Sequence, residues 1–193
     1  MTNGTVPPGK RAFTLPYENL VRRGDAERAP TMHRPGVRVS VESELDLWNT
    51  LSGAELIKAM GEGRFPQLSE INDYIGQSVV DAESGRVTID WTPEEKLCNP
   101  GGTVHGGYIA MILDNAVCLA ASSTLERFIP MLTLSLSVEY VRPVPAGRTH
   151  RVEGVCVHPG KTRMLSNATI TDADGRLLAQ ATASVVPNQA FAR

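Results

Sequence analysis

The residues best suited to chemistry lie in one segment, where a glycine-rich loop leads into an apolar stretch with one acidic side chain. Asp114 is surrounded in sequence by Ile, Met, Leu and Val residues. Burying an unpaired carboxylate costs several kcal/mol, so a chain keeps one there only with a partner or a task. Two interpretations follow. In the structural one, Asp114 is bonded to a neighbouring strand or to Asn115. In the functional one, Asp114 acts as a general base or a nucleophile.

The loop over residues 99–107 contains Pro100 and four glycines, and we expect the helix to begin near Gly106. The first turn of a helix has unpaired backbone N–H groups and a partial positive charge. Glycines allow a ligand to come close to these N–H groups. This end of the helix therefore suits an oxyanion that develops during a reaction.

Gly106 and Asp114 are too far apart to act on one group within a single helix. Eight residues span roughly 12 Å of helix axis. An oxyanion donor and a base should lie within about 6 Å of each other, since each stands roughly 3 Å from the reacting group. Two antiparallel copies of the helix meet this condition, so we expect a homodimer with sites shared across a twofold axis.

The flanking sequence predicts the elements that position this segment. Ser52 and Glu55 have capping-box spacing, which predicts a short helix from about residue 52. Apolar and polar residues alternate over 132–140, with Thr133 on the face opposite the leucines, and this pattern predicts a strand with one buried face. The other predicted strands cover residues 77–82, 86–91, 149–157, 162–171 and 176–186.

Short turns join most of these strands, so the strands must pair antiparallel. Helices that are separate from such a sheet define the α+β class. The helix from Gly106 is apolar nearly all round, so we expect one curved sheet to wrap it.

Composition excludes several classes of function. The chain has 193 residues, 41% of them apolar, and a formal net charge of −2, which fits one globular domain and not a nucleic-acid binder. No apolar run has the roughly 18 residues of a membrane span, and there is no hydrophobic signal segment. The three cysteines and four histidines lack metal-ligand spacing. The cytoplasm is therefore the expected compartment.

The N-terminal region differs from the rest. Residues 1–40 hold seven Lys and Arg against three Asp and Glu, together with five prolines. We interpret residues 1–50 as an irregular arm, either a solvated tail or a strap over a partner subunit or an anionic ligand. Residues 51–193 form the expected single domain, with its core at about 70–187.

The run from Asn99 through His105-Gly106-Gly107 to Asp114-Asn115 resembles the signature of hotdog-fold acyl-CoA thioesterases. These belong to the phenylacetate-degradation (PaaI-type) branch of the 4-hydroxybenzoyl-CoA thioesterase superfamily. The spacings of six and nine residues match that branch. Further matching stretches lie at Thr133–Pro143, Gly160–Thr162 and Asp174–Ala179.

This resemblance implies a hotdog dimer, often paired into tetramers, that hydrolyses acyl-CoA thioesters without a metal or cofactor, CoA being part of the substrate. Asp114 would act as base or nucleophile, and the Gly106 N–H would hold the thioester oxygen. Asn99 and His105 would bind the thioester or position water, and Thr133 would orient that water. Without its context His105 is equally suited to capping the helix.

Three cations, Arg142, Lys161 and Arg163, stand at strand ends or turns. They either meet the phosphates of CoA or form solvated surface. Cys98 is better explained as a small buried apolar residue than as a nucleophile.

The alternative function is a non-catalytic acyl-CoA sensor. Such a sensor needs no buried carboxylate, so Asp114 counts against it. An enoyl-CoA hydratase is a third possibility, but His105 and Asp114 are too far apart along the chain for its acid/base pair.

Overall fold

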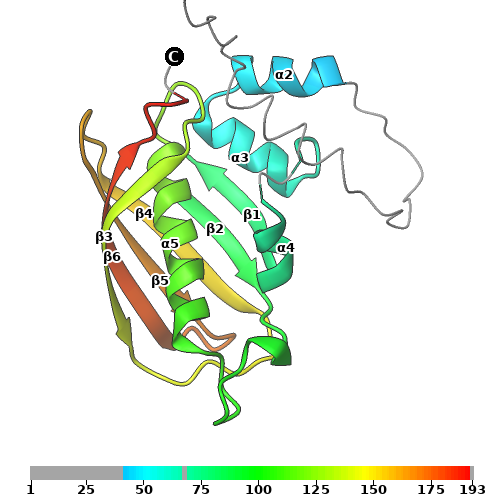
Figure 1. Cartoon of the computed structure of the whole chain (residues 1–193), viewed down its shortest axis with the longest axis vertical. Coiled ribbons are helices and arrows are strands. Elements are labelled where there is room, and N and C mark those ends of the chain that lie inside the picture. The colour runs from blue at the N-terminus through cyan, green and yellow to red at the C-terminus, as the bar shows by residue number, and fades with distance from the viewer. Residues whose placement is uncertain (1–40, 67–68, 192–193) are drawn as a thin grey trace, which may run out of the picture. The chain divides into compact units, whose positions relative to one another are not determined.

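The computed structural model describes residues 41–66 and 69–191, so the expected arm over residues 1–40 lies outside the described residues. Six antiparallel strands form one curved sheet in the order β1-β2-β4-β5-β6-β3 (Figure 1). The strands are β1 (Gln77–Glu83), β2 (Arg86–Trp91), β3 (Met131–Tyr140), β4 (His150–His158), β5 (Met164–Thr171) and β6 (Leu177–Pro187). All six lie where the sequence predicts them.

The long helix α5 (Gly106–Ser122) lies along the concave face of this sheet and contacts β2, β3, β4, β5 and β6. Ile112 and Leu113 on the helix are fully buried, as are Ile89 and Trp91 on β2. At Gly154 the helix comes so close that an added Cβ would lie 2.2 Å from the Ala116 carbonyl oxygen. The expected α+β hotdog fold, a sheet wrapped around a central helix, is therefore confirmed.

Three short helices precede the sheet in the described residues, and two of them have ends set by local residues. In α3 (Gly53–Gly61) the Glu55 N–H donates to Ser52 Oγ, and the Ser52 N–H donates to Glu55 Oε2 at 2.9 Å. This capping box satisfies two backbone donors that a helix start leaves open, and the sequence predicts it. The second helix, α4 (Glu70–Ile75), ends at Gly76, whose φ of 77° is in the left-handed region that favours glycine. A short 3-10 turn, η1 (Glu95–Leu97), follows β2.

The expectation that residues 1–50 are irregular is wrong for residues 41–50, which form helix α2 (Val41–Thr50). Its Trp48 packs on Phe65, Phe128 and Phe191, with ring centroids 6.0, 5.5 and 6.5 Å away. These aromatic partners come from distant parts of the chain. Tertiary packing, which local periodicity does not show, explains why this segment is helical.

Strand β3 contains a β-bulge that changes which side chains share a face. Thr133 pairs with Val185 and Ser135 with Ser184, so Leu134 is the extra residue. Beyond the bulge, Leu136 pairs with Ala183. Thr133 and Leu136 therefore face the same side of the sheet, and the expectation that Thr133 lies opposite all the leucines is wrong. The bulge turns Thr133 toward α5.

Candidate active site

Asp114 lies midway along α5 and is half-buried. The Thr133 hydroxyl on β3 donates a hydrogen bond to Asp114 Oδ1 at 2.7 Å. The sequence allowed two structural partners for the Asp114 carboxylate, a neighbouring strand or Asn115, and the structure shows the bond to the strand. Asn115 instead donates to Gln77 Oε1 at 2.8 Å, on the other side of the helix. The second carboxylate oxygen has no hydrogen-bond donor among the described residues, so it is open to a ligand or to water.

Cys118 is a member of this site that the sequence analysis missed. It stands one helical turn after Asp114, and its Sγ lies 3.4 Å from Thr133 Oγ1. Burial raises the pKa of the Cys118 thiol to about 11, so the thiol keeps its hydrogen at neutral pH. The spacing of four residues from Asp114 was a visible signal that the two side chains share a helix face.

The helix start has the geometry expected of an anion site. His105 is the N-cap of α5, and its Nδ1 accepts a hydrogen bond from the Gly107 N–H at 2.9 Å. This bond leaves His105 Nε2 as the protonated nitrogen of the neutral ring. Among the described residues no acceptor contacts the Gly106 N–H, so this donor is free for a ligand. The capping role of His105 is therefore present, and it is compatible with the predicted substrate contact.

Asn99 braces the loop before the helix. Its Oδ1 accepts from the Gly101 N–H at 2.8 Å, and its Nδ2 donates to Thr103 Oγ1 at 3.1 Å. The adjoining backbone closes the same loop with the Asn99 N–H donating to the Thr103 carbonyl at 2.8 Å. These bonds fix the approach to Gly106. A direct contact between Asn99 and substrate stays a prediction.

A cavity of about 330 Å³ opens beside the helix start. Gly106, Ile109, Tyr140 and Arg142 are among the residues that line it. The Tyr140 hydroxyl donates to the Gly106 carbonyl at 3.0 Å, which ties the end of β3 to the first turn of α5. The free Gly106 N–H therefore belongs to a residue that borders a ligand-sized space.

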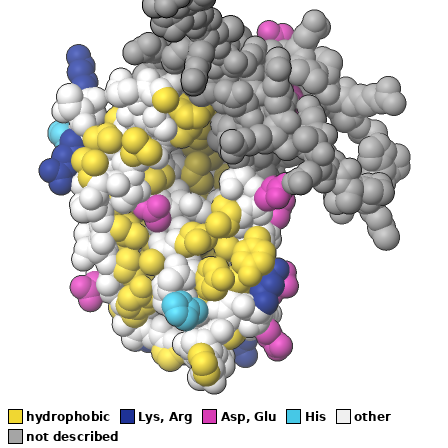
Figure 2. Space-filling model, viewed as in Figure 1, with side chains coloured by type: hydrophobic (Ala, Val, Ile, Leu, Met, Phe, Trp, Pro, Cys, Tyr) yellow, Lys and Arg dark blue, Asp and Glu magenta, His cyan; other side chains and the backbone are white. Residues whose placement is uncertain are grey.

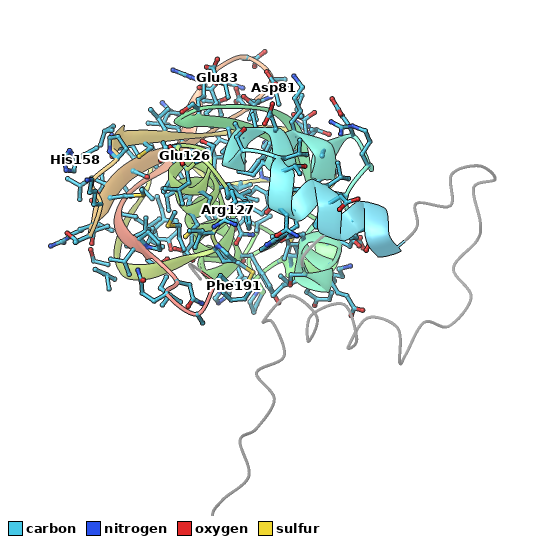
Figure 3. The ribbon with its side chains drawn as sticks, turned by 90° about the horizontal axis from the view of Figure 1, so that it is seen from above. Asp81, Glu83, Glu126, Arg127, His158 and Phe191 are labelled. Carbon is cyan, nitrogen blue, oxygen red and sulfur yellow. The ribbon has the colours of Figure 1, made fainter. Side chains whose placement is uncertain are left out.

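The three cations predicted for phosphate binding do not lie together. Arg142 borders the Gly106 cavity and donates to the Leu177 carbonyl at 2.6 Å. Lys161 and Arg163 follow β4 at the opposite end of the sheet, since Met164 pairs with Val185 and Thr171 with Leu177. Figure 3 shows His158, where that turn begins, pointing outward away from α5. Within one protomer only Arg142, of these three cations, lies near the helix start. Lys161 and Arg163 lie at the opposite end of the sheet.

One protomer does not bring Gly106 and Asp114 together. They stand at the start and in the middle of the same helix, roughly 12 Å apart along its axis.

Within the described part of the chain no group of three or more His, Cys, Asp and Glu is placed to hold a metal ion. No helix in residues 41–66 or 69–191 is long and apolar enough to cross a membrane.

Comparison with known proteins identifies the class. Residues 101–179 match the Thioesterase superfamily family model. Human acyl-coenzyme A thioesterase 13 is 31% identical over 133 residues, which cover 68% of this chain and 91% of the human protein. The fold and these matches show that the chain belongs to the thioesterase superfamily.

Solved structures place it within that superfamily. A Ralstonia eutropha protein described as related to phenylacetic acid degradation has a TM-score of 0.61 and 25% identity, covering 67% of this chain and 98% of that one. A Streptococcus mutans protein solved with acetyl CoA has a TM-score of 0.54 and 29% identity, covering 58% of this chain and 88% of that one. The chain is a PaaI-type hotdog thioesterase, as its sequence signature predicts.

Proposed function

We propose that this protein hydrolyses acyl-CoA thioesters to a carboxylic acid and free CoA. The observation that carries the proposal is the half-buried Asp114, with one oxygen fixed by Thr133 and the other open. A carboxylate held in this way is ready to take a proton from water or to attack a carbonyl. The similarity to a structure that contains acetyl CoA supports a CoA thioester as substrate.

Two routes fit these residues. In the first, Asp114 removes a proton from water, and the resulting hydroxide attacks the thioester carbonyl. The negative oxygen then accepts from a Gly106 N–H, and collapse breaks the C–S bond to release the acid and CoA thiolate, which takes up a proton. In the second, Asp114 attacks the carbonyl itself and expels the CoA thiolate, and water then hydrolyses the mixed anhydride.

We propose that each site forms between two subunits. Strand β3 is an edge strand of the sheet, and Leu132 and Leu134 on it are 50% and 58% exposed. Figure 2 shows hydrophobic side chains spread across the face on which α5 lies. An exposed apolar edge of this kind favours pairing with another strand. A second copy that pairs through β3 would align the two α5 helices antiparallel, with Gly106 of one copy opposite Asp114 of the other.

Replacing Leu134 by Lys is expected to halve the mass of the particle in solution. A lysine on an edge strand opposes pairing with another strand, and two copies would bring two such charges to the shared β3 edge. Light scattering coupled to size exclusion measures the mass. Val80→Lys on β1, at the opposite edge of the sheet and 49% exposed, is the matched control and should leave the mass unchanged. A monomeric wild-type protein would contradict the shared site.

For the CoA moiety, we propose that Arg142 receives a phosphate, because it borders the cavity beside Gly106. Lys161 and Arg163 would serve this purpose only from another subunit, since they lie at the other end of the sheet. Tyr108, which is half-buried near the helix start, and Met111 and Ile112 on α5 are proposed to shape the acyl pocket.

The assay that tests this function is release of free thiol from a panel of acyl-CoAs. The wild-type protein is expected to release CoA from at least one aromatic or medium-chain substrate, as measured with a thiol reagent. Tight binding without release would instead favour the non-catalytic sensor. Equilibrium binding is measured on the same panel. A sensor would bind a panel member tightly without releasing CoA, whereas a hydrolase whose preferred acyl group is absent from the panel would bind none of them tightly.

A further inference from the structure

We propose that Cys118 is a positioning residue: its S–H donates to Thr133 Oγ1 and keeps the Thr133 hydroxyl hydrogen directed at Asp114. This inference rests on the proposed function, because it concerns the group that would activate water. It adds a third side chain, from the same helix as Asp114, to the hydrogen-bonded pair of Asp114 and Thr133.

The geometry that carries this inference is a short chain of three side chains. Asp114 and Cys118 are separated by one turn of α5, so both project from one face of the helix. The bulge in β3 places Thr133 against that face. Thr133 Oγ1 lies 2.7 Å from Asp114 Oδ1 and 3.4 Å from Cys118 Sγ. One hydroxyl therefore contacts both side chains of the helix.

Counting hydrogens fixes the direction of both bonds. An ionised carboxylate only accepts, and a hydroxyl has one hydrogen to give. The Thr133 hydrogen therefore goes to Asp114, and the thiol must be the donor in its contact with Thr133. The high pKa of Cys118, about 11, means that this hydrogen is present throughout the neutral range.

This arrangement leaves a defined place for the attacking water. Thr133 Oγ1 keeps one lone pair, and Asp114 keeps its second oxygen without a partner among the described residues. A water that donates one hydrogen to each would have its own lone pairs free for attack. Without the thiol hydrogen, the Thr133 oxygen accepts from other waters, and the attacking water is less often in place. The effect falls on kcat, because the thiol does not touch the substrate in this scheme.

The test compares Cys118→Ser, which keeps a donor, with Cys118→Val, which keeps similar volume without one. Loss of one uncharged hydrogen bond predicts a three- to tenfold lower kcat for Cys118→Val, by order of magnitude, with an unchanged KM. The Ser variant should have a kcat near that of the wild type. Cys156→Ser on β4, which has no hydrogen bond to the site, is the matched control.

Thermal unfolding of each variant reports packing separately from kcat. If Cys118→Ser and Cys118→Val are equally impaired, or both match the wild type, the positioning role is wrong. Asp114→Asn is assayed beside them, so that the proposed role of Asp114 and the positioning role of Cys118 are tested separately. If that variant loses activity while Cys118→Val does not, only the role of Cys118 is overturned. If the wild type releases no CoA, the proposed function and this inference are both overturned.

Discussion

Replacing Asp114 by Asn is expected to lower kcat for acyl-CoA hydrolysis by about 10²- to 10⁴-fold, the range for losing a general base. The amide oxygen of Asn can still accept the hydrogen bond from Thr133, which is 2.7 Å long in the wild type. The structure around the helix is therefore retained. The amide cannot take a proton from water or attack a carbonyl, so both proposed routes stop.

The expected KM of this variant is close to that of the wild type, because the carboxylate acts on the reacting centre. The measurement is steady-state thiol release at saturating substrate. Asp81→Asn removes an exposed carboxylate that pairs with Lys58 at 3.0 Å, far along the chain from the site, and serves as the matched control. An Asp114→Asn enzyme with wild-type kcat would exclude this residue as base or nucleophile.

Replacing Gly106 by Pro is expected to lower kcat by about 10²- to 10³-fold, the usual loss for one oxyanion donor. Proline removes the Gly106 N–H, the donor proposed to hold the oxyanion. The helix tolerates it, because Gly106 is the first residue of α5 and proline is favoured there. His105 has φ −62° and ψ 135°, the extended conformation that a residue before proline prefers.

The Gly106→Ala variant is the matched control, because it adds a Cβ but keeps the N–H. An added Cβ would lie 3.4 Å from the Tyr140 ring, which is about the limit of ordinary contact. The kcat of Gly106→Ala should therefore lie well above that of Gly106→Pro. Equal losses in the two variants would assign the effect to the added carbon, and the N–H would then have no role in catalysis.

Much of the fold was predictable because its signals are local. The alternation in β3, the apolar helix α5 and the capping box at Ser52 each follow from a few neighbouring residues. The pairing of Asp114 with a neighbouring strand was one of two open interpretations. The oxyanion role of the helix start stays a prediction, made from Gly106 and the loop before it.

Other features depend on contacts that no local pattern shows. The bulge at Leu134 moves Thr133 onto the face of α5, although strict alternation places it opposite the leucines. Helix α2 depends on Trp48 packing with aromatic rings from distant segments. The separation of Arg142 from Lys161 and Arg163 follows from the strand register, which the sequence leaves open.

Mixed dimers test the central claim most directly, namely that each site uses Gly106 of one subunit and Asp114 of the other. Gly106→Pro and Asp114→Asn chains with different affinity tags would be co-expressed, and dimers with both tags isolated. In such a dimer one of the two shared sites has both groups intact, so about half of the wild-type kcat per dimer should return. If every site instead used both residues from one chain, each site would lack one group, and the mixed dimer would stay as inactive as its parents.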